Sequence, residues 1–117
     1  MNSSDENGER NYELAAASHG EATLNGNSKK ANHAYSNIVK YLLKLREDED
    51  KGEGSLLRLS KNENLSVVCW ASTHLLQLNE AEAIDRLKYI AAIDRGPMGF
   101  NAEMVLKEWA AGRLRLP

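Results

Sequence analysis

The chain has 117 residues, of which 42% are hydrophobic and 27% charged, the size and balance of one ordinary globular domain. The formal net charge of −2 and the pI near 5.9 argue against direct nucleic-acid binding and against attraction to an anionic membrane. The single cysteine, Cys69, excludes an intramolecular disulfide, and no apolar run reaches the roughly 18 residues of a membrane-spanning helix.

The N-terminal segment, residues 1–9, is polar and acidic and has no large apolar side chain after Met1. We expect it to be a disordered tail rather than a secretory signal, which predicts a cytoplasmic protein with a single α-helical domain over 10–117. The first helix is predicted over 11–24. A glycine inside a helix costs about 1 kcal/mol relative to alanine, so Gly20 predicts close packing against the second helix. The residues expected to face inward are Leu14, Ala15, Ser18 and Ala22.

The second predicted helix has the clearest apolar pattern in the chain. Asn25-Gly26-Asn27 tolerates the left-handed backbone that ends a helix, and Ser28 is expected to cap the next one. The short connection predicts an antiparallel hairpin over 10–47, which we interpret as a cap on the rest of the fold. The apolar positions recur with a period of 3.6 residues, at Ala31, Ala34, Tyr35, Ile38, Leu42 and Leu45.

An acidic segment over residues 47–54 follows this hairpin. Its two glycines and its charge predict a hydrated, mobile loop, which we take as the main internal boundary of the domain. Its acidic side chains are Glu47, Asp48, Glu49, Asp50 and Glu53.

Shorter helices are predicted after the acidic segment, over 55–59 and 66–78. Asn79 with Glu82 forms a capping box for the next helix, which Gly96-Pro97 interrupts. The last helix is expected to be capped by Asn101 and to end at Gly112, with Ala102, Val105, Leu106 and Trp109 inward. The prediction is therefore about six helices and no strand.

The segment from Asn62 to Leu76 resembles the opening of a HEAT-type repeat, in which a polar turn leads into a helix with Val, Ala and a Leu pair. Val67, Ala71, Leu75 and Leu76 fill those places. The arginine that usually follows the valine is absent, which argues against a long repeat array.

The chain from about Tyr12 to Leu114 also resembles a small bacterial family of HEAT/ARM-like helical domains. The likeness rests on His19-Gly20-Glu21-Ala22-Thr23, on Trp70-Ala71-Ser72-Thr73-His74-Leu75-Leu76, and on Gly99-Phe100-Asn101-Ala102 with the helix that follows. It implies a short right-handed α-superhelix of antiparallel helical hairpins, with residues 54–112 as its HEAT-like part, and no enzymatic activity. Some proteins of this kind resemble immunity proteins that neutralise a secreted toxin, as in contact-dependent inhibition.

No catalytic motif is found, whether a P-loop, a G-x-S-x-G elbow or an H-E-x-x-H zinc pattern, and no cofactor is expected. His19, His33 and His74 are far apart in sequence. They would have to converge in space to bind a metal, and helix-surface or hydrogen-bonded positions are the commoner outcome, so no metal site is predicted. Cys69 lies in the most apolar helix and is expected to fill the core rather than to react.

The function predicted from this likeness and the charge pattern is protein binding, as an immunity protein that covers the active site of a cognate toxin. The alternative is a HEAT-like adaptor or assembly module for another protein partner. A basic nuclease domain would complement the acidic segment, whose simpler interpretation is a solvated loop. We expect a monomer in the absence of the partner. The predicted contact residues are Glu47, Asp48, Asp50 and Glu53, with Tyr41 as an aromatic anchor and Trp70 as either core or interface.

Overall fold

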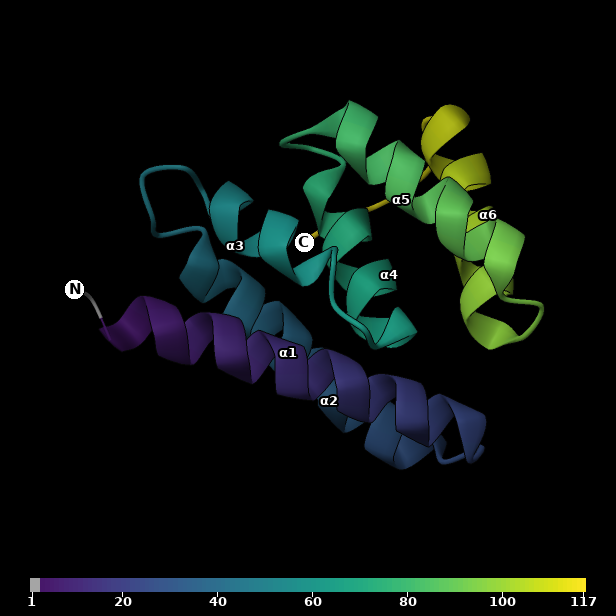
Figure 1. Cartoon of the computed structure of the whole chain (residues 1–117). Coiled ribbons are helices and arrows are strands. Elements are labelled where there is room, and N and C mark those ends of the chain that lie inside the picture. The colour runs from purple at the N-terminus through teal and green to yellow at the C-terminus, as the bar shows by residue number, and fades with distance from the viewer. Residues whose placement is uncertain (1–2) are drawn as a thin grey trace.

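The computed structural model of the chain describes residues 3–117, with the side chains of residues 8–117. Within this range the chain forms six α-helices and no strand, which confirms the all-α prediction. Consecutive helices pair into three hairpins that follow one another across the molecule in chain order (Figure 1). The helices are α1 (Ser3–Leu24), α2 (Ser28–Leu45), α3 (Glu53–Leu59), α4 (Leu65–Leu75), α5 (Glu80–Ile93) and α6 (Pro97–Ala110).

Helix α4 lies at the centre of the fold and contacts α1, α3, α5 and α6. Nine of its eleven residues are buried. Its burial requires cover on more than one side, and the first hairpin covers one side of it and the third hairpin the other (Figure 1).

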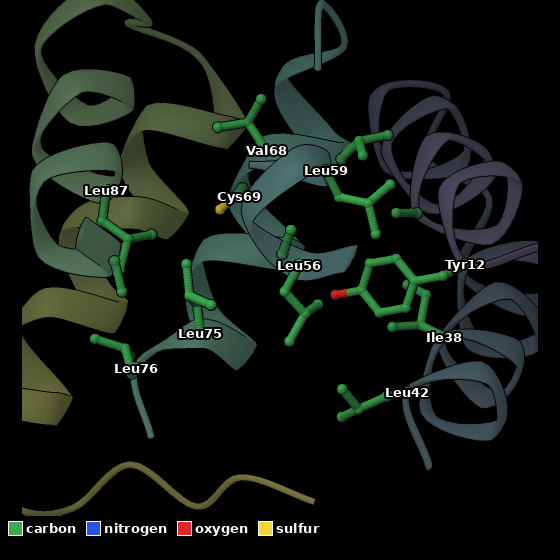
Figure 2. Packing of buried hydrophobic residues seen from close by; sticks show 14 of the residues in the cluster. Tyr12, Ile38, Leu42, Leu56, Leu59, Val68, Cys69, Leu75, Leu76 and Leu87 are labelled. Carbon is green, nitrogen blue, oxygen red and sulfur yellow. The ribbon is translucent and has the colours of Figure 1, made fainter. Parts of the chain in front are cut away.

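One continuous cluster of buried apolar side chains includes residues from all six helices. Figure 2 shows Tyr12, Ile38 and Leu42 of the first hairpin on one side of the α3–α4 hairpin, and Leu87 of α5 on the other. Because every helix contributes to the same cluster, the six helices are stabilised as one unit.

Helix α1 begins at Ser3 and not at residue 11, so most of the segment predicted to be a disordered tail is helical. The physical reason is contact with α2 and α3. Gly8 is buried against α2, where a Cβ would lie 3.5 Å from Leu45 Cδ2, and Glu9 is paired with Arg58. Met1 and Asn2, also part of that prediction, lie outside the described residues.

Two of the predicted helix caps are wrong and one is confirmed. Asn27, not Ser28, caps α2 by accepting a hydrogen bond from the main-chain N–H of Lys30 at 3.0 Å. Asn79 caps α5 as predicted, through the N–H of Glu82, but the second half of the predicted capping box is not formed, because the N–H of Asn79 donates to the main-chain oxygen of Leu75 and the Glu82 carboxylate pairs with Arg86. Helix α6 begins at Pro97 rather than after Asn101, because the fixed φ of proline suits the first helical position.

The inward face of α1 differs from the prediction, while that of α2 largely agrees with it. Leu14 is 50% exposed, and Tyr12 is fully buried instead. The α2 pattern buries Ala34, Ile38, Leu42 and Leu45, but leaves Tyr35 42% exposed. The face of α1 that packs against the core is therefore formed by Tyr12, Ala15, Ala16 and Ala22.

Candidate functional site

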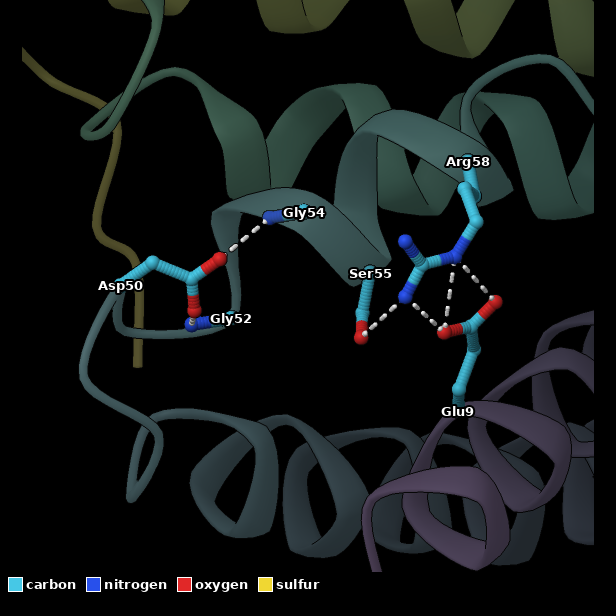
Figure 3. A network of polar contacts seen from close by, with 6 residues as sticks. All are labelled: Glu9, Asp50, Gly52, Gly54, Ser55 and Arg58. Atoms are coloured by element: carbon cyan, nitrogen blue, oxygen red, sulfur yellow. Dashed lines mark hydrogen bonds and ion pairs between the residues drawn. The ribbon is translucent and has the colours of Figure 1, made fainter. Parts of the chain in front are cut away.

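The acidic segment between α2 and α3 is a fixed turn and not a loosely held loop. The carboxylate of Asp50 accepts hydrogen bonds from the N–H groups of Gly52 and Gly54, each at 2.9 Å (Figure 3). These bonds hold the pKa of Asp50 below its ordinary value. One of the predicted contact residues therefore serves to shape the turn.

Glycine is required at the point where this turn reaches α3. Gly52 has φ of +86°, and a Cβ there would come within 2.9 Å of the Leu45 side chain. Lys51 before it also has positive φ, at 57°. The turn is thus pressed against the end of α2, and its backbone has little freedom to change shape.

The acidic side chains of the turn have different surroundings. Glu53 accepts a hydrogen bond from Asn79 at 3.4 Å, and Asp48 is half-buried. Glu47 and Glu49 are exposed and, among the described residues, have no ion-pair partner. The outward charge of the turn is therefore carried mainly by these two glutamates.

Two acidic residues of α1, Glu9 and Glu13, are engaged in contacts within the fold. The carboxylate of Glu9 accepts hydrogen bonds from Nε and Nη2 of Arg58, the shortest at 2.7 Å (Figure 3). Glu13 pairs with Arg10 and also accepts a hydrogen bond from Asn62 at 3.0 Å. These carboxylates stabilise the contact between α1 and the second hairpin and add little free negative charge.

The two predicted aromatic anchors lie apart from one another. Tyr41 is half-buried on α2 and packs against the core, with Lys40 Nζ 5.4 Å from its ring centroid. Trp70 of α4 contacts Tyr35, which lies ten residues before the end of α2 at Leu45 and so about 15 Å from the acidic turn along the helix. The structure therefore does not bring Trp70 together with the acidic turn.

A cluster of aromatic and histidine rings, not predicted from the sequence, surrounds Trp70. Its ring contacts His19 edge-on at 5.0 Å, Tyr35 at 5.6 Å and His74 at 5.7 Å between centroids. His74 in turn shares a 2.7 Å hydrogen bond with the buried hydroxyl of Tyr12. The spacing of Trp70 and His74, four residues apart on one helix, was the sequence signal for this cluster.

Burial keeps the ionisable groups of this cluster neutral. Desolvation, with a smaller effect of the Arg46 charge, lowers the pKa of His74 from 6.5 to about 3. Desolvation also raises the pKa of Tyr12 well above 10.0. The neutral imidazole shares one hydrogen bond with the neutral phenol, between Nδ1 and the hydroxyl, with the donor set by the tautomer of His74, so the pair acts as a buried hydrogen bond rather than as an acid or a base near neutral pH.

The other candidate chemical groups are separated from one another. His33 is exposed on α2, and no three His, Cys, Asp or Glu side chains among the described residues are grouped to hold a metal ion. Burial raises the pKa of the Cys69 thiol, whose sulfur accepts a hydrogen bond from Asn101 at 3.4 Å. No helix within 3–117 is long and apolar enough to cross a membrane.

A groove of about 630 Å³ lies between the C-terminal half of α1, the start of α4 and the α5–α6 turn. Its lining is mainly apolar and includes Ala17, Leu24 and Met98. The groove borders a close approach of two helices, where Gly20 of α1 meets Ser66 of α4. The close contact of Gly20 is thus with α4, and the prediction that it packs against the second helix is wrong.

These features define an all-α protein of three packed helical hairpins with an acidic turn between the first two. Its fold is similar to that of the crystal structure of the protein RPA1889 from Rhodopseudomonas palustris CGA009. The TM-score is 0.87 with 17% sequence identity, over 97% of this chain and 93% of that one, which shows a shared fold. No protein-family model and no curated protein sequence matches the chain.

Proposed function

We propose that the chain is a non-enzymatic protein-binding protein, and specifically an immunity protein that neutralises a cognate toxin by covering its active site. The observation that carries the proposal is the anchored acidic turn. Asp50 fixes the backbone through two amide hydrogen bonds, and Glu47 and Glu49 extend from it into solvent. Such a turn offers negative charge in a preorganised shape.

Preorganisation matters because binding is weakened by the entropy lost when a flexible loop becomes ordered. A turn whose shape is set by Asp50 and Gly52 avoids most of that loss. Exposed carboxylates also accelerate the encounter with a basic surface, such as the substrate cleft of a nuclease. The expected partner is therefore a basic toxin domain, met in the cytoplasm by a monomeric inhibitor.

We further propose that the three hairpins form a short right-handed superhelix of the HEAT/ARM type. The chain-order packing of the hairpins and the central position of α4 support this proposal. In that arrangement the acidic turn sits at the junction of the capping hairpin, 10–47, and the HEAT-like part, 54–112.

The test is charge reversal in the turn with a matched control elsewhere. Co-expression with the product of the neighbouring gene identifies the toxin, and its binding to Glu47→Lys/Glu49→Lys is compared with binding to Asp85→Lys/Glu103→Lys. The control acids are exposed and lie on the third hairpin. We expect the turn variant to lose about tenfold or more in affinity at low salt and less at high salt, and the control to change little.

Equal losses of affinity in both variants would show that only the net charge of the protein matters and that the turn does not lie in the interface. Binding that leaves the activity of the partner intact would instead support the adaptor function. A rescue assay in cells that express the toxin separates these outcomes, because only an immunity protein restores growth.

A further inference from the structure

Helix α2 carries an exposed apolar stripe along one side. Tyr35, Val39 and Leu43 recur every fourth residue and therefore lie on the same side of the helix. Tyr35 is 42% exposed, Leu43 is 49% exposed, and Val39 is half-buried. Trp70 of α4 extends the stripe sideways through its contact with Tyr35.

The aromatic end of this stripe is packed on several sides. The ring of Trp70 contacts His19 and His74, and His74 shares a hydrogen bond with the buried Tyr12 hydroxyl. A partly exposed tryptophan held by such contacts, beside an exposed tyrosine, is typical of the residues that contribute most to protein–protein binding.

A row of cationic side chains runs along the outer face of the same helix. Its members are Lys29, Lys40 and Lys44, all exposed, and together they form the lysine row. Their separations of eleven and four residues place them on one face, next to the apolar stripe. Within the described part of the chain none of them has an ion-pair partner, since the only pair on α2 joins Lys30 to Glu21.

The negative charge of the chain lies elsewhere, so this face has a sign opposite to the net charge. From Ala22 to Arg46 the sequence has no aspartate or glutamate. The net charge of −2 averages this cationic helix with the acidic turn that follows it and with the other helices. The local potential, and not the average, determines which partner approaches α2.

We propose that this face of α2, with Trp70, binds an acidic amphipathic segment of a partner protein. Apolar side chains of the segment pack on the stripe of Tyr35, Val39 and Leu43, while its carboxylates face the lysine row. The aliphatic part of the stripe favours a protein over nucleic acid, because bases stack on aromatic rings and not on valine or leucine. The acidic turn of a second copy does not fit, since residues 47–54 have no apolar side chain and are held in a turn.

The probe is a synthetic helical peptide with leucines along one side and glutamates beside them, and its counterpart has lysine in place of every glutamate. Binding at low salt is followed by titration calorimetry and by tryptophan fluorescence. We expect the acidic peptide to bind about tenfold tighter than the basic one. Lys29→Glu/Lys40→Glu/Lys44→Glu should remove that preference, while Lys61→Glu/Lys88→Glu/Lys107→Glu, a control of equal charge at exposed sites, should keep it.

A matched pair of leucines tests the apolar stripe. Leu43→Ser should weaken binding of the acidic peptide about fivefold, and Leu14→Ser, at a site of nearly equal exposure on α1, should leave it unchanged. All of these sites are exposed, and circular dichroism checks that each variant folds.

Three outcomes overturn the proposal. Equal affinity for the acidic and the basic peptide would show that the face does not select for negative charge. Equal losses in the two lysine triple variants would show that the preference depends on the net charge of the protein and not on the lysine row. Tighter binding of a single-stranded DNA oligonucleotide, with the same sensitivity to the lysine row, would assign the face to nucleic acid. None of these measurements uses the toxin, so they stand apart from the immunity proposal.

Discussion

Replacing Gly20 by alanine should destabilise the fold even though alanine is the better helix former. A Cβ at position 20 would overlap the Ser66 Cβ and come within 2.6 Å of its Oγ. Ser66 is buried and donates a hydrogen bond from Oγ to the main-chain oxygen of Ala16 at 2.7 Å. The new methyl group must therefore push α1 and α4 apart or break that bond.

The two opposing effects differ in size. Overpacking costs about 1–3 kcal/mol, and loss of a buried hydrogen bond adds about 1 kcal/mol. Against this, the change from glycine to alanine inside a helix contributes about 1 kcal/mol of stability. The clash outweighs the gain in helix propensity, so we expect Gly20→Ala to lower the free energy of unfolding by about 1–3 kcal/mol.

The sign of the effect should reverse when Ser66 is removed. In a Ser66→Gly background the nearest remaining atom is the Cα of residue 66, at 3.9 Å, which is ordinary contact. Gly20→Ala should then raise the free energy of unfolding by up to about 1 kcal/mol. Urea unfolding of the two single variants and the double variant completes the cycle.

Gly8→Ala is the control within the same helix. Its Cβ would lie 3.5 Å from the Leu45 side chain, so it should be neutral or stabilising. If Gly20→Ala is as stable as the parent, or if the two changes at 20 and 66 are additive, the close contact between α1 and α4 does not limit the fold and the reasoning is wrong.

Three further results are expected. Gly99→Ala should cost about 3 kcal/mol or more in thermal unfolding, because its Cβ would overlap the main-chain oxygen of Asp94, which cannot move aside as a side chain can. The pKa of His74 is about 3 in the folded protein and 6.5 in the unfolded chain, so between pH 3 and 6.5 the unfolded chain binds more protons. The free energy of unfolding therefore falls as the pH falls through this range, by up to about 1.4 kcal/mol per pH unit. Urea unfolding of His74→Gln should show a flatter dependence over this window, and an unchanged one would contradict the assignment. Asp50→Asn has one acceptor oxygen for the two amide bonds of the turn, so hydrogen exchange at Gly52 or at Gly54 should become roughly tenfold faster, and unchanged rates at both would show that the turn is held by other contacts.

The sequence predicts the helices well where a local pattern decides them. The 3.6-residue spacing of Ile38, Leu42 and Leu45 fixes the buried face of α2, and Gly112 with φ of +71° ends α6 as expected. Asn79 caps α5 because its side chain needs only the neighbouring N–H groups. In each case the deciding interaction lies within a few residues of the signal.

Long-range contacts decide the features that the sequence did not predict. Tyr12 and His74 are 62 residues apart, and only the packing of α1 on α4 makes their hydrogen bond possible. From the sequence of α1 alone, either Leu14 or Tyr12 could face the core. Contact with the other helices buries Tyr12 and leaves Leu14 exposed. The start of α1 at Ser3 likewise depends on a partner in another helix, since Glu9 meets Arg58 across the interface.

Surface chemistry was predictable in composition but not in arrangement. The acidic run after α2 is evident from the sequence, yet the use of Asp50 to hold the backbone appears only when Gly52 and Gly54 are placed around it. The lysine row was equally present in the sequence. The net charge of the whole chain does not reveal it, because the acidic residues of the other segments cancel the lysines of this one helix face.

The opposite charges of the acidic turn and the lysine row lie close enough to influence one another. Lys44 lies in the last turn of α2 and Glu47 just beyond its end, where the N–H of Glu47 donates to the main-chain oxygen of Lys44 at 3.1 Å, well within the Debye length of about 8 Å at physiological salt. An acidic ligand on the lysine row would neutralise the charge that repels a basic partner from the turn, and each ligand would therefore strengthen binding of the other. Salt would weaken this coupling along with both contacts, because all three depend on exposed charges. The net charge of the chain describes neither surface, because the fold places the acidic residues of the turn and the lysines of α2 on different parts of the molecule.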